Sequence, residues 1–272
     1  MSTIAFIGGG NMARSLIGGL ITRGHPAGAI RVAEPVPTLQ DALVADFGIV
    51  AADSNLDAIT GADVVLFAVK PQVMATVCLE LRAALSAGRP LLISIAAGIS
   101  LANFEQWLGT DLRLIRAMPN TPALIGAGIT GIYADPAVDA DDRALAASVL
   151  AAVGPTVWIE QEALMDAVTA VSGSGPAYFF LLMESMIAAG VAQGLSEPAA
   201  RELVLNTALG AARMAVNEPL GPAELRRRVT SPNGTTQAAI ETFEAGGFRE
   251  LTARAIARAT ERGRELSQQA GG

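Results

Sequence analysis

The stretch IAFIGGGNMA, residues 4–13, decides the fold. An apolar run typical of a buried strand leads into Gly8, Gly10 and Ala13, which follow the pattern G-x-G-x-x-A, and a helical pattern begins at Met12. The first glycine allows a tight turn, the second allows close approach of a pyrophosphate, and the third small residue lets the helix pack on the strand. Because a pyrophosphate binds well to amides at a helix N-terminus, this stretch predicts a dinucleotide-binding loop rather than an ordinary tight turn.

Strand-like and helix-like segments alternate from this loop to about residue 160. The predicted strands cover residues 3–7, 30–33, 64–69, 91–95, 112–117, 129–133 and 156–159. The predicted helices cover residues 12–23, 37–47, 72–85, 101–108 and 139–152. This alternation predicts an α/β Rossmann-type domain, a parallel, doubly wound sheet with helices on both faces.

The strand signals stop after residue 161, and helices are predicted over residues 176–194, 197–216, 222–228, 236–244 and 248–269. The first two helices are apolar on more than one side, which is typical of helices buried in a core or against a partner. A domain of about 110 residues has little interior of its own. We therefore expect a Rossmann domain over residues 1–161 and an all-α dimerisation domain over residues 162–272.

Composition limits the classes of partner. The net charge of −7 argues against nucleic acid and anionic membranes. We expect no signal peptide and no membrane span, because the longest apolar run, residues 177–192, is short and contains Glu184 and Ser185. Cys78 is the only cysteine, which excludes a disulfide within the chain and cysteine-based zinc sites. No metal site is predicted, and a reducing cytoplasm is the expected location.

Three further residues are predicted at the cofactor site. Glu34 ends a strand about twenty residues after the glycine loop, where an acid binds the adenosine ribose and favours NADH over NADPH. Lys70 is the only lysine, and it ends a strand at the carboxyl edge of the sheet, where ligands bind in such folds. Asn55 precedes that strand and is expected on the adenosine side.

The scarcity of histidine and lysine limits the hydride chemistry. His25 is the only histidine, and we expect it in a solvent-exposed loop at the opposite edge of the sheet, away from the reaction. The β-hydroxyacid dehydrogenases use a lysine on the helical domain, but residues 162–272 contain none. A cyclic imine needs neither group, because it is protonated near neutral pH and hydride attacks the iminium carbon directly. The protein then supplies position and polarity.

A second glycine-containing loop, VTSPNGTTQAAIETF at residues 229–243, leads into a predicted helix. The amides of Gly234, Thr235 and Thr236 predict a site for the carboxylate of the substrate. Ser231 adds a hydroxyl, and Thr236 is the candidate catalytic residue that orients the ring nitrogen. A helix cap is the alternative, since Ser, Thr, Asn and Gly are the usual cap residues, but three hydroxyls exceed what a cap needs.

Together these stretches resemble the Δ1-pyrroline-5-carboxylate reductase family. The matching pieces are IGGGNMARSLIGGL, VVLFAVKPQ, SIAAGIS, RAMPNTPA, VSGSGPAYFF and LRRRVTSPNGTTQAAI, and they cover most of the chain. The resemblance implies reduction of pyrroline-5-carboxylate to L-proline by NADPH or NADH, in a homodimer or a pentamer of dimers.

The resemblance also assigns roles residue by residue. It implies cofactor contacts at Ile7, Gly8, Gly9, Gly10, Asn11, Met12, Asn55, Ala68, Val69, Lys70, Pro71, Ala96 and Ala97. It implies substrate contacts at Met118, Pro119, Asn120, Ser231, Gly234, Thr235 and Thr236. Two positions depart from the family pattern: Asn233 replaces a glycine, and Glu34 stands where NADPH-preferring relatives tend to carry small polar or basic residues.

Two other functions stay open at this point. A β-hydroxyacid dehydrogenase would turn over a hydroxy acid without reducing an imine. A dinucleotide sensor would bind the cofactor without turnover of any imine, although the hydroxyl-rich loop argues against it.

Overall fold

The computed structural model describes residues 2–110 and 112–270. The chain forms two compact units, one made of residues up to Ser174 together with those from Arg258 onward, the other of Gly175–Ala257. The first unit extends to Ser174 because the helical turns after residue 161 pack on the sheet. There, Val168 lies directly over Gly131, leaving no room for a Cβ at that glycine. The predicted limits of the two domains, 1–161 and 162–272, stay a prediction.

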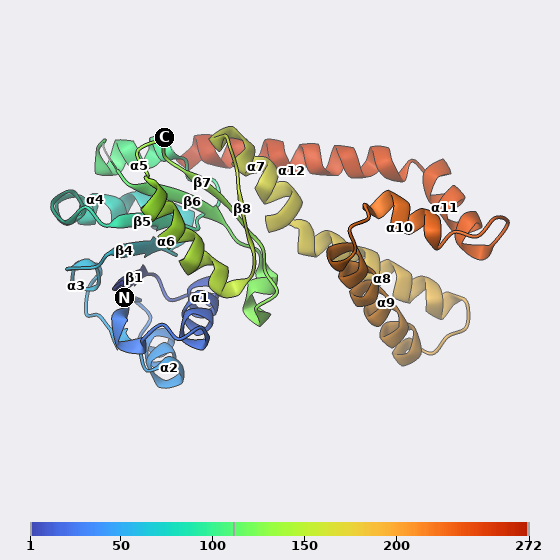
Figure 1. Ribbon diagram of the computed structural model, residues 1–272, viewed down its shortest axis with the longest axis horizontal. Helices are drawn as coiled ribbons and strands as arrows, with labels where there is room; N and C mark the ends of the chain where they lie inside the picture. The colour runs from blue at the N-terminus through green and yellow to red at the C-terminus, as the bar shows by residue number, and fades with distance from the viewer. Residues whose placement is uncertain (1, 111, 271–272) are drawn as a thin grey trace. The chain divides into compact units, whose positions relative to one another are not determined.

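The first unit is built on an eight-stranded sheet with the order β3-β2-β1-β4-β5-β6-β7-β8 (Figure 1). The strands are β1 (Ile4–Ile7), β2 (Ile30–Ala33), β3 (Val50–Ala51), β4 (Val64–Phe67), β5 (Leu91–Ser94), β6 (Leu114–Met118), β7 (Thr130–Ala134) and β8 (Thr156–Trp158). The order reverses at β1, and ligands of open α/β sheets bind at such a switch point, outside the carboxyl ends of the strands.

One strand departs from the predicted parallel sheet. The pairs from β3 to β6 are parallel, as is β7 with β8, but β7 runs antiparallel to β6. The sheet is thus parallel as predicted except at the β6–β7 pair. The connection from β6 holds only a 3₁₀ turn at Thr121–Ile125, whereas a parallel partner needs a longer crossover, usually with a helix.

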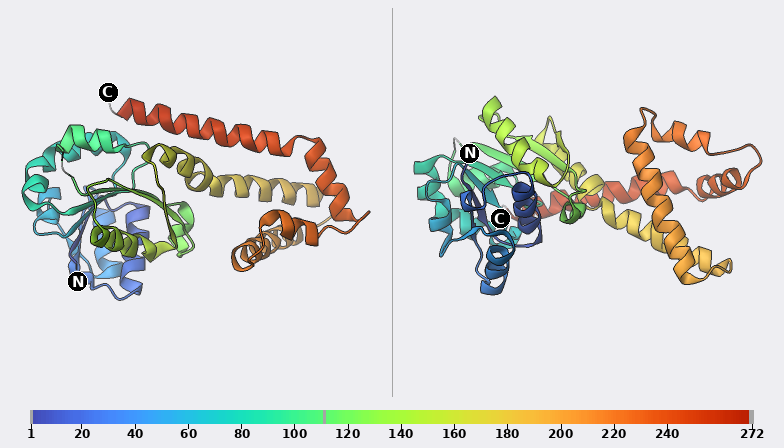
Figure 2. Two further views of the ribbon diagram at one scale, coloured as in Figure 1. Left: turned by 45° about the horizontal axis from the view of Figure 1, so that its top comes forward. Right: turned by 60° about the horizontal axis from the view of Figure 1, so that its bottom comes forward.

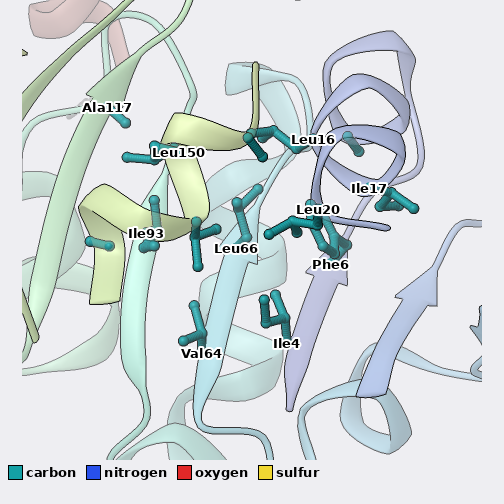
Figure 3. Close-up of a cluster of buried hydrophobic side chains, with 14 of the residues drawn as sticks. Ile4, Phe6, Leu16, Ile17, Leu20, Val64, Leu66, Ile93, Ala117 and Leu150 are labelled. Carbon is teal, nitrogen blue, oxygen red and sulfur yellow. The ribbon is translucent and has the colours of Figure 1, made fainter. Parts of the chain in front are cut away.

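Helices cover both faces of the sheet, as the three views show (Figures 1 and 2). They are α1 (Asn11–Thr22), α2 (Pro37–Phe47), α3 (Asn55–Ile59), α4 (Pro71–Gly88), α5 (Leu101–Leu108) and α6 (Ala140–Leu150). Alternate strand residues point to opposite faces. Ile4 and Phe6 pack under α1, α2 and α6 (Figure 3), whereas Ala5 and Ile7 pack under α3, α4 and α5. Burial on both faces explains the near-continuous apolar runs of these strands.

His25 is not solvent-exposed as predicted. The His25 backbone N–H donates to the Leu20 carbonyl at 3.0 Å, which folds the loop back against the end of α1. The residue is half-buried, and its Nε2 is buried without a hydrogen-bond partner among the described residues. The prediction of an exposed loop histidine is wrong because a local backbone hydrogen bond turns this segment inward.

The second unit is helical, as predicted. It contains α8 (Gly175–Ala192), α9 (Glu197–Asn217), α10 (Pro222–Arg228), α11 (Thr235–Ala245) and the first part of α12 (Phe248–Ala270). Helices α8 and α9 pack against each other, yet Phe179, Phe180 and Leu181 of α8 remain more than 60% exposed. By length and composition alone, the helical run Glu162–Ala192 is long and apolar enough to cross a membrane. Of its most apolar stretch of 18 residues, 6% is buried.

Candidate functional site

The carboxyl edge of the sheet gathers the predicted cofactor residues of the first unit. The loop residues 8–12 follow β1, Glu34 follows β2, Asn55 follows β3, residues 68–71 follow β4, residues 96–97 follow β5, and residues 119–120 follow β6, which ends at Met118. These strands are mutually parallel, so their carboxyl ends share one edge. The structure therefore brings these residues to the edge where ligands bind.

The glycine loop is shaped to receive a pyrophosphate. Gly8 has φ +98°, and a Cβ there would lie 3.0 Å from the carbonyl carbon and oxygen of Ala68. Gly10 precedes the first turn of α1, no side chain caps that helix, and a Cβ on Gly10 would meet nothing within 4 Å. The first-turn amides of α1 are thus open to an anion, and the loop fits a dinucleotide.

Glu34 lies against the glycine loop itself. Its carboxylate accepts hydrogen bonds from the Gly9 N–H at 2.7 Å and from the Val36 N–H at 3.0 Å. The side chain therefore braces the loop as well as placing a negative charge beside it. Nearby, the exposed Lys70 precedes the first turn of α4, and Asn55 Nδ2 donates to Glu80 Oε2 at 3.2 Å.

Two predicted substrate residues at the end of β6, Met118 and Asn120, lie against Ser172 and Gly173. A Cβ on Gly173 would lie 2.4 Å from Met118 Cε, so the absence of a side chain there admits the methionine. The buried Asn120 accepts from the Ile129 N–H at 3.0 Å, and its Nδ2 lies 3.5 Å from Ser172 Oγ. Residues 169–173 form a π-helical turn, a geometry frequent at functional sites.

A charged cluster was not predicted from the sequence. Arg116 is 8% exposed, and its Nη1 donates to Glu162 Oε1 at 2.5 Å, while the same oxygen accepts from the Leu101 N–H at 2.7 Å. Burial raises the pKa of Asp166, and the charges of Arg116 and Arg264 oppose that rise. The one sequence signal for this cluster is Arg116 itself, a charged residue within the apolar strand LIRAM, where a buried charge needs a partner. Within residues 2–110 and 112–270, no three His, Cys, Asp or Glu side chains gather as a metal site.

The second glycine-containing loop opens α11 without a side-chain cap. Gly234 precedes the first helical residue, and its N–H donates to the Ser231 carbonyl at 3.1 Å. Asn233 has φ +59°, a left-handed conformation that Asn tolerates, so the turn survives without the family's usual glycine. The cap position itself is held by Gly234, which has no side chain, so no hydroxyl stands there. Whether the hydroxyls of this loop serve a helix cap or a ligand stays a prediction.

Comparisons with known proteins match both halves of the chain. A model described as pyrroline-5-carboxylate reductase dimerisation matches residues 162–266, and one described as NADP oxidoreductase, coenzyme F420-dependent, matches residues 3–98. The chain is 52% identical over 273 residues to a pyrroline-5-carboxylate reductase of Pseudomonas aeruginosa, covering 100% of both chains. The chain belongs to the pyrroline-5-carboxylate reductase family.

Solved structures of reductases in this family share the fold. The structure from Coxiella burnetii has a TM-score of 0.94 and 43% identity, and covers 98% of each chain. The structure of the Plasmodium falciparum enzyme, with NADP bound, has a TM-score of 0.85 and 28% identity, again covering 98% of each chain. The predicted family and fold class are confirmed, and the chain is an oxidoreductase that acts on a small molecule. The exposed apolar residues of α8 lie within the segment that the dimerisation model matches.

Proposed function

We propose that this protein reduces Δ1-pyrroline-5-carboxylate to L-proline with NADPH or NADH, the last step of proline biosynthesis. The observation that carries the proposal is the opening of α11, where a glycine holds the cap position and the Ser231, Thr235 and Thr236 hydroxyls stand beside the first-turn amides of a helix N-terminus. The relatives named pyrroline-5-carboxylate reductase align along the whole chain, including this loop.

The cofactor binds at the carboxyl edge of the sheet. Its proposed contacts are Ile7, Gly8, Gly9, Gly10, Asn11, Met12, Asn55, Ala68, Val69, Lys70, Pro71, Ala96 and Ala97. NADPH or NADH supplies the hydride when bound. The glycine loop and the amides of α1 hold the pyrophosphate, and Glu34, fixed by two backbone amides, favours the unphosphorylated ribose of NADH.

The substrate is held by polarity rather than by a titrating side chain. Its carboxylate rests on the amides of Thr235 and Thr236, with the Ser231 hydroxyl as a further donor. The Gly234 N–H already donates to the Ser231 carbonyl, so the proposed contact at Gly234 is close approach of its backbone rather than an amide hydrogen bond. The Thr236 hydroxyl orients the ring nitrogen. Met118, Pro119 and Asn120 are proposed as substrate contacts because of the resemblance to the family. The imine enters protonated, so the product amine keeps that proton and no histidine or cysteine is required.

The test is steady-state oxidation of NADH and NADPH with pyrroline-5-carboxylate. Thr236→Ala should keep the fold and lower kcat/KM by about tenfold or more, the value of one oriented hydrogen bond. Thr242→Ala is the matched control, because it removes a hydroxyl of the same helix that donates to the Ala238 carbonyl. Wild-type kinetics in Thr236→Ala would remove this residue from the mechanism.

Two outcomes with the wild-type protein would favour the other functions. Turnover of a hydroxy acid without imine reduction would favour a β-hydroxyacid dehydrogenase. Cofactor binding without turnover, together with failure to restore growth of a proline auxotroph, would favour a sensor.

The proposed assembly is a homodimer formed through the helical segment, or a pentamer of such dimers, in the cytoplasm and without nucleic-acid or membrane partners. The support is the large exposed apolar surface of α8 together with the net charge of −7. Sizing of the native protein distinguishes the dimer from the pentamer of dimers, and a detergent-free preparation that sediments with vesicles would contradict the absence of a membrane partner.

A further inference from the structure

The loop between β5 and α5, residues 95–100, contains Ala96 and Ala97 and is fixed at its far end. Ser100 and Asn103 form a reciprocal capping box: Ser100 Oγ accepts from the Asn103 N–H at 3.2 Å, and Asn103 Oδ1 accepts from the Ser100 N–H at 2.9 Å. The capping box leaves the first amide of α5, that of Leu101, without an acceptor in its own segment.

Glu162 takes that remaining amide. Its Oε1 accepts from the Leu101 N–H at 2.7 Å and from Arg116 Nη1 at 2.5 Å. The two donors, Leu101 and Arg116, are 7% and 8% exposed, and the Glu162 side chain is 28% exposed, so these hydrogen bonds are partly shielded from water. One carboxylate oxygen thus ties the start of α5 to strand β6, from a position 61 residues away along the chain.

The middle of the loop rests on the end of α12, within the same compact unit. Gly98 has φ +73°, and a Cβ there would lie 3.4 Å from the Leu266 Cβ and 3.6 Å from the Ser267 nitrogen. Further along α12, Gly263 packs on Asp166, four residues after Glu162, where a Cβ would lie 3.0 Å from Oδ1. The segment that carries Glu162 and the helix behind the loop therefore support each other.

We propose that Glu162 is a positioning residue for the cofactor, because its bridge between Leu101 and Arg116 holds the loop that carries Ala96 and Ala97. This inference rests on the proposed function, in which those two residues contact the cofactor. The carboxylate acts through the loop and touches neither cofactor nor substrate. A charge-assisted hydrogen bond suits this role, since it is shorter and stronger than a neutral one.

The test compares Glu162→Ala with Glu162→Gln. Glu162→Ala should raise the KM and Kd for NADPH and NADH about fivefold or more, as expected for the loss of a charge-assisted hydrogen bond. The KM for pyrroline-5-carboxylate should stay within about twofold. Glu162→Gln should lie between this variant and the wild type, because its amide oxygen still accepts from the Leu101 N–H. Glu160→Ala, the same charge change at an exposed position two residues earlier, should match the wild type.

A second readout follows the amide itself. Hydrogen exchange of Leu101 should speed up in Glu162→Ala more than exchange in β1, which reports on the whole domain. Cofactor Kd within twofold of wild type in Glu162→Ala, or equal acceleration of exchange in both segments, would overturn the proposal. If Glu162→Ala does not fold, Glu162→Gln decides by the same measurements. Wild-type protein that binds cofactor but reduces no imine would refute the proposed function, while Kd and exchange would still decide the role of Glu162.

Discussion

Replacing Glu34 by glutamine should shift cofactor preference toward NADPH. The carboxylate is held beside the glycine loop by the amides of Gly9 and Val36, so its negative charge is fixed where the adenosine ribose is expected. For a 2′-phosphate charge about 6 Å away, at an effective dielectric constant of about 40, the repulsion is about 1.4 kcal/mol. That free energy corresponds to about a tenfold change in the NADPH to NADH ratio of kcat/KM.

Glu34→Gln also removes a hydrogen bond to a backbone amide, but this loss does not change the NADPH to NADH ratio of kcat/KM. Glutamine has one acceptor oxygen, so one of the two loop amides loses its partner, at about 0.5–1.5 kcal/mol. This loss weakens both cofactors alike and cancels in the ratio. Glu34→Ser, which removes both contacts and the charge, should therefore show the same shift in preference with lower absolute kcat/KM.

The assay is kcat/KM for each cofactor at saturating imine, with Glu105→Gln as a control that removes a charge from an exposed position on α5. Because the repulsion is electrostatic and partly exposed to solvent, the shift should shrink as salt is raised. An NADPH to NADH ratio unchanged within twofold in Glu34→Gln would show that the carboxylate does not face the ribose, and the reasoning would fail.

Three further predictions concern packing and ionisation. Gly19→Ala should destabilise the protein by about 2 kcal/mol or more in urea unfolding, because its Cβ would lie 2.3 Å from the Ala152 carbonyl oxygen, while Gly28→Ala, with nothing within 4 Å, should stay within about 0.5 kcal/mol. Burial raises the pKa of Cys78 to about 12, so the folded protein should resist thiol reagents at about pH 8, and rapid labelling before unfolding would contradict this. Burial also raises the pKa of Asp166 above 3.8, so the stability of the wild-type protein falls as pH rises through the raised pKa. Asp166→Asn should therefore increase Tm at neutral pH, and this increase should disappear below pH 3.8. An increase in Tm that grows on acidification would contradict the prediction.

Local signals in the sequence predicted the nucleotide-binding half well. The glycine pattern after β1 and the apolar runs of the strands depend on neighbours along the chain, so the sheet, its helices and the edge where the site lies were all predictable. The direction of β7 and the inward turn of His25 were not, because each depends on how a connection folds back on the sheet or on α1.

The loop before α11 shows a different limit. Its residue types fit both a helix cap and a ligand site, and only the geometry shows that a glycine, with no side chain, holds the cap position. The ion pair between Glu162 and Arg116 joins residues 46 apart in the sequence. Nothing in the sequence around Glu162 distinguishes it from an acidic residue on the surface. Contacts of that kind follow from tertiary packing, which sequence periodicity does not encode.

Lys70, the chain's single lysine, stands exposed at the entrance to α4, at the ligand-binding edge of the sheet. An acylating reagent directed at side-chain amines therefore has one target in this protein, and that target lies at the edge of the sheet where we propose that the dinucleotide binds. A fluorophore attached there would report occupancy directly, and acetylation of this one nitrogen would remove the chain's only ammonium group from the place where phosphates are expected.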